Sequence, residues 1–292
     1  MIPPPVFGGV PTAKMDRMRL LLSMVLAIPL SLTSYGASVD GAKVHWTSKG
    51  TARQTVILVH GWTCDETSWD SQVPALSQKY RVITLDLPGH GKSDPPKDGK
   101  FSMAVFARAV EAVREEAKVD KAVLVGHSMG TPVIREYARM YPQHIAGLVP
   151  VDGLLVLSAG GPGRGGAPNP AAMSGPDGMK ARETMIRGMF TPATPAAIQQ
   201  HVLKMMLAPP EVTAVGAMNA TFDSSSLNND VGMMPVLGIY AGNSPMANRD
   251  NLKKTFPNSE YVQVAGTGHF VMMERPEEFN RLLLGFLGKL KY

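Results

Sequence analysis

The stretch that decides the fold runs from Lys121 to Tyr137 and reads KAVLVGHSMGTPVIREY. A short apolar run, Ala122 to Val125, ends at Gly126-His127-Ser128-Met129-Gly130, and a segment with helical character follows from Thr131 to Met140. A serine between two glycines, spaced G-x-S-x-G on a strand-to-helix turn, is the pattern of a nucleophile elbow. We therefore expect Ser128 to sit in a tight turn with strained backbone geometry.

The same turn explains the glycines at 126 and 130, because a side chain at either position would collide with its surroundings. The hydroxyl of Ser128 would stand clear of the sheet. The Met129 N–H and the N-terminus of the following helix would then face any negative charge that develops beside it. This stretch predicts a serine nucleophile.

Composition is that of an ordinary globular protein, with 44% hydrophobic and 18% charged residues in 292. This length fits one large domain, or a core with an inserted subdomain. The residues before Ser38 contribute +2 of the net charge of +5 and leave +3 dispersed over the rest, which argues against a nucleic-acid interface. The single cysteine, Cys64, excludes an internal disulfide.

Residues 14–38 have the pattern of an export signal. Basic residues precede the apolar run Leu20 to Leu32, and small residues follow up to Ser38. The run is too short for a good transmembrane helix. We expect residues 1–37 to be a leader that is cleaved near Gly36 or Ser38, giving an exported protein, periplasmic or secreted, without stable membrane association. An uncleaved N-terminal anchor or a disordered leader is the alternative.

Beyond the leader, strand patterns alternate with helix patterns, which predicts a mostly parallel sheet covered on both faces. The strands are expected at 39–46, 54–59, 81–85, 122–125, 145–151, 235–241 and 261–265. The helices are expected at 67–78, 102–117, 131–140, 246–256 and 276–289.

The alternation breaks between Leu154 and Asn229. Residues 159–170 are too rich in glycine and proline for regular structure, and helices follow near 176–190, 195–207 and 210–221, each opened by a proline. We assign 154–230 to a helical cap inserted into a core made of 38–153 and 231–292. The cap is rich in methionine, which either fills its interior or lines an adaptable apolar pocket.

Four motifs follow one another along the chain: H-G-W at 60–62, D-L-P-G-H-G-K-S at 86–93, G-H-S-M-G at 126–130, and G-T-G-H at 266–269 followed by E-R-P at 274–276. With these motifs the chain resembles the α/β-hydrolase family, in its capped esterase, haloperoxidase and lactonase-like branch. The resemblance covers residue 39 to the C-terminus, with the cap least constrained. It implies an α/β-hydrolase fold with a helical cap and no cofactor.

The resemblance also implies roles for individual residues. Ser128 would be the nucleophile, and His269, on the loop after the last strand, the base. The backbone N–H groups of Trp62 and Met129 would form the oxyanion hole. Serine rather than aspartate at the elbow points to acyl transfer.

The triad acid is where the chain departs from the family. The usual place, just after the strand 235–241, reads Gly242-Asn243-Ser244-Pro245 and holds no carboxylate. Some family members place the acid after the strand that follows the elbow helix, and here that strand ends in Asp152. We favour Asp152, with Asp223 at the cap exit and a neutral Asn243 as alternatives, and we expect Asp250 to lie inside the following helix.

The remaining candidates are expected to be structural. His60, His90 and His127 lie in family motifs, where histidine commonly shapes the site, and His45, His144 and His201 are expected on the surface or in the cap. No cluster of histidines and carboxylates has metal-ligand spacing, so we predict no metal. Cys64 is expected to be a small buried residue or part of the pocket wall.

Together these features predict an enzyme that hydrolyses carboxylic esters, or lactones, of small molecules through an acyl-enzyme intermediate. Perhydrolysis or haloperoxidase-like chemistry, and hydrolysis of a C–C bond, would use the same triad. From another class, a non-catalytic protein of this fold could bind an apolar ligand under its cap, an alternative that the missing carboxylate after Ala241 keeps open.

Overall fold

The computed structural model describes residues 1–5, 8, 33–154, 169–223 and 232–292. The chain divides into two units, Met1–Leu30 and Ser31–Tyr292, and every element named below belongs to the second. Most of the predicted leader, and the predicted linker up to residue 168, lie outside the described residues. Among the helices within the described ranges, none is long and apolar enough to cross a membrane.

Eight strands form one sheet in the order β1-β2-β4-β3-β5-β6-β7-β8. The pairs β1–β2 and β2–β4 are antiparallel, and all other neighbours are parallel. The predicted α/β-hydrolase sheet is therefore confirmed. The strands are β1 Thr33–Val39, β2 Ala42–Lys49, β3 Thr55–Val59, β4 Arg81–Leu85, β5 Ala122–His127, β6 Ile145–Val151, β7 Val236–Ala241 and β8 Ser259–Val264.

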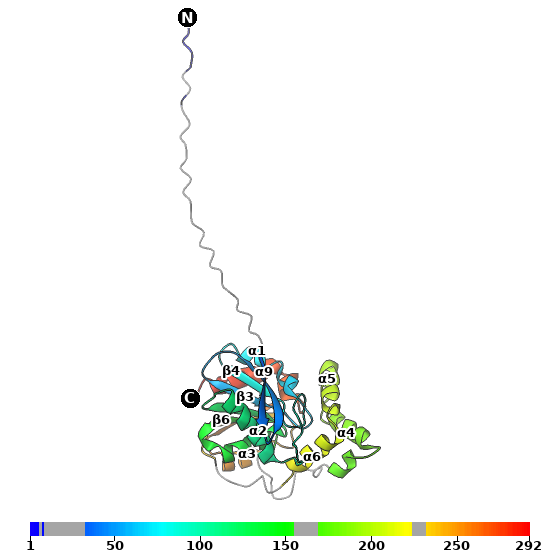
Figure 1. Ribbon diagram of the computed structural model, residues 1–292. Coiled ribbons are helices and arrows are strands. Elements are labelled where there is room, and N and C mark those ends of the chain that lie inside the picture. Colours follow the sequence, from blue (N-terminus) through cyan, green and yellow to red (C-terminus); the bar gives the residue numbers. More distant parts are fainter. Residues whose placement is uncertain (6–7, 9–32, 155–168, 224–231) are drawn as a thin grey trace. The chain divides into compact units, whose positions relative to one another are not determined.

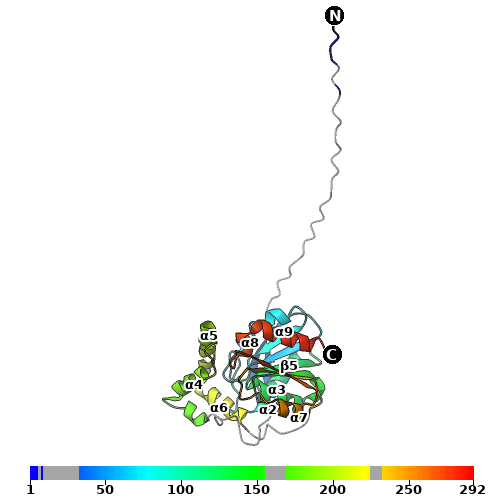
Figure 2. The same cartoon turned by 180° about the vertical axis from the view of Figure 1, so that it is seen from behind.

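The central strands are apolar on both faces because helices cover both faces of the sheet. Every residue of β3 and β5 is buried. Helix α2 (Met103–Glu116) packs against α3 (Gly130–Met140), and α1 (Val73–Leu76) packs against α9 (Pro276–Leu287). Figures 1 and 2 show the two pairs on opposite faces of the sheet.

The helix starts follow their capping residues. Ser102 Oγ accepts the N–H of Val105 at 3.1 Å and begins α2, as the sequence predicts. Helix α7 (Arg249–Thr255) begins three residues later than predicted, since Asn248 Oδ1 caps it by accepting the N–H of Asn251 at 2.9 Å. The short elements η2 (Pro142–His144) and α8 (Val271–Glu274) complete the core.

The prediction of one helix over 67–78 is wrong. The chain forms a 3₁₀ turn, η1 (Glu66–Trp69), and then the short α1. Asp65 Oδ1 accepts the N–H of Thr67 at 2.9 Å and starts the first turn. Pro74 has no N–H to contribute to a continuous helical ladder, so the segment breaks into two pieces.

Between β6 and β7 the chain forms a group of helices that Figures 1 and 2 show gathered beside the core. They are η3 (Pro170–Met173), α4 (Gly178–Arg187), α5 (Ala196–Leu207) and α6 (Glu211–Thr221). Pro195 and Pro210 sit immediately before α5 and α6, in agreement with the predicted proline starts. Trp62 Nε1–H donates to the Ala214 carbonyl of α6 at 2.7 Å, which ties this group of helices, the predicted cap, to the sheet.

The first hairpin begins earlier than predicted. Strand β1 runs alongside β2 from Thr33, which pairs with Ser48, to Val39, which pairs with Ala42. Ala37 and Val39 are buried in the core. The two expected cleavage positions, Gly36 and Ser38, therefore lie within a strand of the sheet.

Candidate active site

Ser128 stands on the turn between β5 and α3. Its φ is +53°, in the left-handed region that non-glycine residues rarely adopt. Its N–H donates to the Val151 carbonyl at 2.9 Å, which fixes the turn to the end of β6. A Cβ added at Gly126 would lie 2.2 Å from the Gly130 carbonyl oxygen, and one at Gly130 would lie 2.5 Å from the Val59 carbonyl oxygen. The elbow geometry therefore requires both glycines.

The two residues predicted to form the oxyanion hole are Trp62 and Met129. Gly61, which precedes Trp62, runs so close to the elbow that an added Cβ would meet Ser128 Cβ at 3.1 Å. Trp62 and Met129 are both buried, and the backbone hydrogen bonds of the described residues include none donated by either N–H. Buried N–H groups without a partner are rare. The assignment of these two N–H groups to an oxyanion hole stays a prediction.

The structure brings His269 and Asp152 together across 117 residues of sequence. His269 Nδ1 lies 2.7 Å from Asp152 Oδ2. His127, the residue before the nucleophile, contacts the same histidine, since its Nε2 lies 2.9 Å from the His269 carbonyl oxygen and the two rings are 4.7 Å apart. The elbow, the histidine loop and the end of β6 therefore meet at one place.

Asp152 is held tightly at the end of β6. It is 2% exposed and has a φ of +41°, and its Oδ1 accepts the N–H of Ala241 at 3.0 Å. Burial acts to raise the pKa of this carboxyl, but hydrogen bonding to His269 and that ring's charge, with smaller contributions from Ser244 and Ala241, outweigh it and hold the pKa below its usual range. Asp152 is thus an anion placed to orient a histidine.

The other acid candidates lie elsewhere. Asp223, Asn243 and Asp250 are all exposed, and Asp250 lies in the first turn of α7, as the sequence predicts. The His269 ring nitrogen faces Asp152 instead. The Ser244 side chain also bonds to the Asp152 carboxyl and helps to lower its pKa. The sequence did not point to Ser244, because serine carries no charge and the search was for a carboxylate.

The motif histidines His60, His90 and His127 are buried, and each has a ring nitrogen hydrogen-bonded to a backbone group. His60 Nε2 accepts the N–H of Leu87 at 2.9 Å, so its Nδ1 donates to the Gly61 carbonyl at 2.8 Å. Burial lowers the pKa of His60, and it lowers the pKa values of His90 and His127 to about 3. All three rings are therefore neutral parts of the framework, as the sequence predicts.

The E-R-P motif contributes a residue whose function the sequence did not reveal. Glu274 Oε2 accepts the N–H of Gly268 at 2.9 Å and the hydroxyl of Thr194, in the cap, at 3.1 Å. The His269 N–H donates to the cap carbonyl of Met189 at 3.2 Å. The only clue in the sequence is the position of the motif five residues after the histidine.

Cys64 is buried, as expected of a structural residue. Its N–H donates to the Gly61 carbonyl at 3.2 Å. Burial, with the nearby charge of Asp65, raises the pKa of the thiol to about 12. A thiol that stays protonated at neutral pH is a poor nucleophile.

One group of possible metal ligands occurs in the described part of the chain. His45, Glu66 and Asp86 bring their ligand atoms within 4.8 Å of one another. They already bond to protein groups, since Glu66 Oε1 lies 2.9 Å from His45 Nε2 and 3.0 Å from Lys92 Nζ, and Asp86 accepts the N–H groups of Glu66 and Lys92. The Lys92 ammonium supplies the positive charge there, and the absence of a metal stays a prediction.

The position of His45 corrects one expectation. The sequence places it on the surface or in the cap, but it is buried in β2. Its imidazole bonds to Glu66, whose other carboxyl oxygen accepts the hydroxyls of Thr47 and Thr84. The sequence did not indicate that His45 is buried, because the polar side chain gives no sign of Glu66, the partner that lies 21 residues further along the chain.

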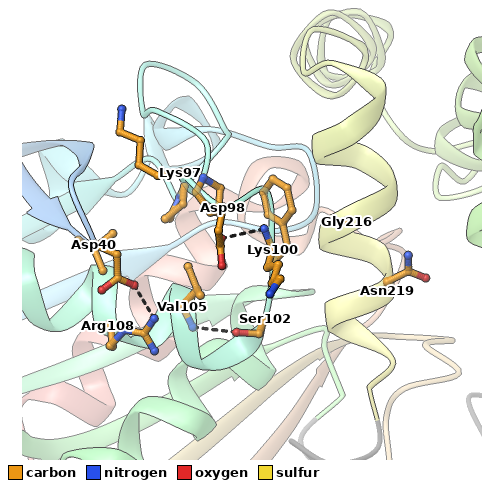
Figure 3. Close-up of a pocket in the computed structure, with 13 residues that line it drawn as sticks. Asp40, Lys97, Asp98, Lys100, Ser102, Val105, Arg108, Gly216 and Asn219 are labelled. Atoms are coloured by element: carbon orange, nitrogen blue, oxygen red, sulfur yellow. Dashed lines mark hydrogen bonds and ion pairs between the residues drawn. The ribbon is translucent and has the colours of Figure 1, made fainter.

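A separate pocket of about 770 Å³ lies between the core and α6 (Figure 3). Val39, Phe101 and Val105 are among its apolar lining residues. Gly216 and Asn219 of α6 lie on one side of it (Figure 3). Two of its charged side chains, Asp40 and Arg108, form an ion pair at 2.5 Å, and Asp98 accepts the Lys100 N–H at 3.0 Å. None of the predicted catalytic residues lines this pocket, so it is distinct from the site around Ser128.

Comparison with known proteins agrees with this geometry. A family model described as alpha/beta hydrolase fold matches residues 54–172. The dihydrolipoyllysine-residue acetyltransferase component of the acetoin cleaving system of Pseudomonas putida is 30% identical over 264 residues, covering 87% of this chain and 69% of that protein. The protein therefore belongs to the α/β-hydrolase fold family.

Two solved structures of similar chains are described as enzymes. Est816, described as an N-acyl homoserine lactone degrading enzyme, is 26% identical with a TM-score of 0.71, covering 86% of this chain and 100% of that one. The esterase RhEst1 from Rhodococcus sp. ECU1013 is 25% identical with a TM-score of 0.74, covering 89% of this chain and 100% of that one.

Proposed function

We propose that this protein is a serine hydrolase that cleaves carboxylic esters of small molecules through an acyl-enzyme intermediate. One observation carries the proposal: His269 Nδ1 lies 2.7 Å from the buried Asp152 carboxyl, on a loop that contacts the elbow bearing Ser128. A histidine bonded to a carboxylate through Nδ1 has its Nε2 free to take a proton, which is the arrangement that activates a serine.

The reaction follows from these groups. His269 takes the proton of the Ser128 hydroxyl as Oγ forms a bond to the ester carbonyl carbon. The N–H groups of Trp62 and Met129 stabilise the oxyanion, and each such donor is worth roughly 10²- to 10³-fold in kcat. His269 then gives the proton to the leaving alcohol as the C–O bond breaks. Water repeats the cycle with the acyl-enzyme and releases the acid and free Ser128.

Lactones are a second candidate substrate class. The likeness to Est816 supports it, and the chemistry is identical except that the leaving alcohol remains attached to the acyl chain. Four methionines of the cap, Met173, Met205, Met206 and Met218, are buried. Met179 is exposed.

The test is the initial rate on aryl esters with two, four, eight and twelve acyl carbons. The Ser128→Ala variant should lose turnover completely above background while its circular dichroism stays native, and Ser71→Ala, an exposed serine far along the chain from the elbow, should match wild type. Rapid labelling of wild type, but not Ser128→Ala, by a fluorophosphonate should accompany this. Turnover retained by folded Ser128→Ala would refute the mechanism.

Export through the N-terminal leader is part of the proposal and rests on residues 14–38 of the sequence. Because β1 begins at Thr33, cleavage ahead of this strand would preserve the whole sheet, whereas cleavage near Ser38 would remove most of β1.

A further inference from the structure

We propose that the cap segment Met189–Thr194 is part of the catalytic framework, and that Thr194 and Glu274 are positioning residues for the loop that carries His269. The inference rests on the proposed function, in which His269 is the base. It goes beyond it by assigning to the cap a role in aligning the base rather than only covering the substrate.

Glu274 joins the cap to the histidine loop through one oxygen atom. Oε2 accepts the Gly268 N–H at 2.9 Å from the loop and the Thr194 hydroxyl at 3.1 Å from the cap. Both residues are buried, with Thr194 3% and Glu274 9% exposed. Buried polar contacts of this kind are costly to break, because the groups left behind have no water to bond with. The loop and the cap are therefore held by the same side chain.

The surroundings of the Thr194 hydroxyl make it a donor to Glu274. Its oxygen accepts the N–H of Thr191 at 3.0 Å. The Thr191 hydroxyl oxygen also lies 3.3 Å from it. A hydroxyl has one proton, and because a carboxylate can only accept, the Thr194 proton goes to Glu274 Oε2 at 3.1 Å and the Thr191 hydroxyl donates to Thr194. The Thr194 N–H in turn donates to the Thr191 carbonyl at 3.0 Å, which closes a compact turn of the cap against the core.

A second contact reaches the base directly. The N–H of His269 donates to the carbonyl of Met189 at 3.2 Å. The fit is close, since a Cβ added at Gly268 would lie 2.9 Å from that carbonyl oxygen and 3.0 Å from Glu274 Oε1. Gly268 thus allows the cap backbone to approach the loop, and two successive N–H groups of the loop are held, one by the cap itself and one by Glu274.

This arrangement has a consequence for catalysis. If the segment 189–194 shifts, the His269 N–H loses the Met189 carbonyl and Glu274 loses the Thr194 hydroxyl that holds it beside the Gly268 N–H. The imidazole then moves relative to Ser128 and Asp152. Small misplacements of a catalytic group reduce kcat strongly. The effect should appear in kcat rather than in KM, because Thr194 and Glu274 act on the base and not on the substrate.

Two measurements on three variants test this. Thr194→Val keeps the size of the side chain and removes the hydroxyl, and Thr194→Ser restores it. The matched control is Thr221→Val in α6 of the same cap, whose hydroxyl bonds only within its own helix, to Ala217 O at 2.7 Å. The measurements are hydrogen–deuterium exchange of the peptide containing Gly268 and His269, and kcat and KM on an aryl ester.

We expect exchange at the histidine loop to be about tenfold faster in Thr194→Val, the factor that corresponds to losing roughly one hydrogen bond. The kcat should fall about tenfold or more, with KM changed less than about twofold. Thr194→Ser and Thr221→Val should behave like wild type in both measurements.

Unchanged exchange in folded Thr194→Val would overturn the inference, whether or not the protein has esterase activity. Equal effects from Thr221→Val, or a change in KM alone, would also overturn it, since either would mean a general loosening of the cap. Failure of the proposed function would look different: wild type would neither turn over esters nor react with a fluorophosphonate, while the exchange measurement would still report the coupling.

Discussion

Replacing Gly126 by alanine should damage both stability and catalysis by a predictable amount. The added Cβ would lie 2.2 Å from the Gly130 carbonyl oxygen, 2.5 Å from its carbon and 3.0 Å from the Thr131 nitrogen. Non-bonded carbon contacts are optimal at roughly 3.5–4.0 Å. All three atoms are backbone at the start of α3, so no side chain can turn aside, and the start of the helix must retreat by about 1 Å.

Overpacking of this kind costs about 1–3 kcal/mol in the free energy of unfolding. The same displacement carries Ser128 away from His269, and a misplacement of about 1 Å can cost about 10²-fold in kcat. Gly285→Ala is the matched control, because Gly285 is exposed within α9 and an added Cβ meets nothing within 4 Å. That change should stabilise the protein by about 0.5–1 kcal/mol, since alanine favours a helix interior.

Urea unfolding followed by circular dichroism gives the free energies, and initial rates on an aryl ester give kcat. The stability result does not depend on the proposed activity. Gly126→Ala with wild-type values of both quantities would refute the packing argument for the elbow. A Gly285→Ala variant that is as unstable as Gly126→Ala would show that any added methyl group harms this fold.

Two further predictions concern charge. Asp152→Asn should lower kcat by about 10⁴-fold, because the amide stabilises neither the correct tautomer nor the imidazolium of the base; Asp250→Asn should have no effect, and a reversed ranking would place the acid elsewhere. The free energy of unfolding should fall as the pH is lowered from about 6.5 to about 4, because His90 in the unfolded chain binds a proton in this range. Buried His90 in the folded protein does not, since its pKa is lowered to about 3. This difference should contribute about 1 kcal/mol per pH unit. Urea unfolding at several pH values should show a shallower slope for His90→Asn and the wild-type slope for the half-buried control His144→Asn; equal slopes in all three proteins would contradict this.

The sequence by itself determined the features that depend on local pattern. Strands at 81–85 and 145–151 have the predicted bounds. A strand of a parallel sheet that is covered on both faces is a nearly continuous apolar run, so the flanking turn residues mark its ends. The elbow at Gly126–Gly130 follows in the same way, since only glycine fits the close approach of backbone on either side of Ser128.

Tertiary structure decided everything that depends on which distant residues meet. The sequence named Asp152, Asp223 and Asn243 as possible partners of His269, and only the fold places Asp152 2.7 Å from it, because parallel strands bring their carboxyl ends to the same edge of the sheet. The burial of His45 with Glu66 is of the same kind. The bond from Thr194 to Glu274 spans 80 residues, and a hydrogen bond between two such side chains leaves no periodic trace in a sequence.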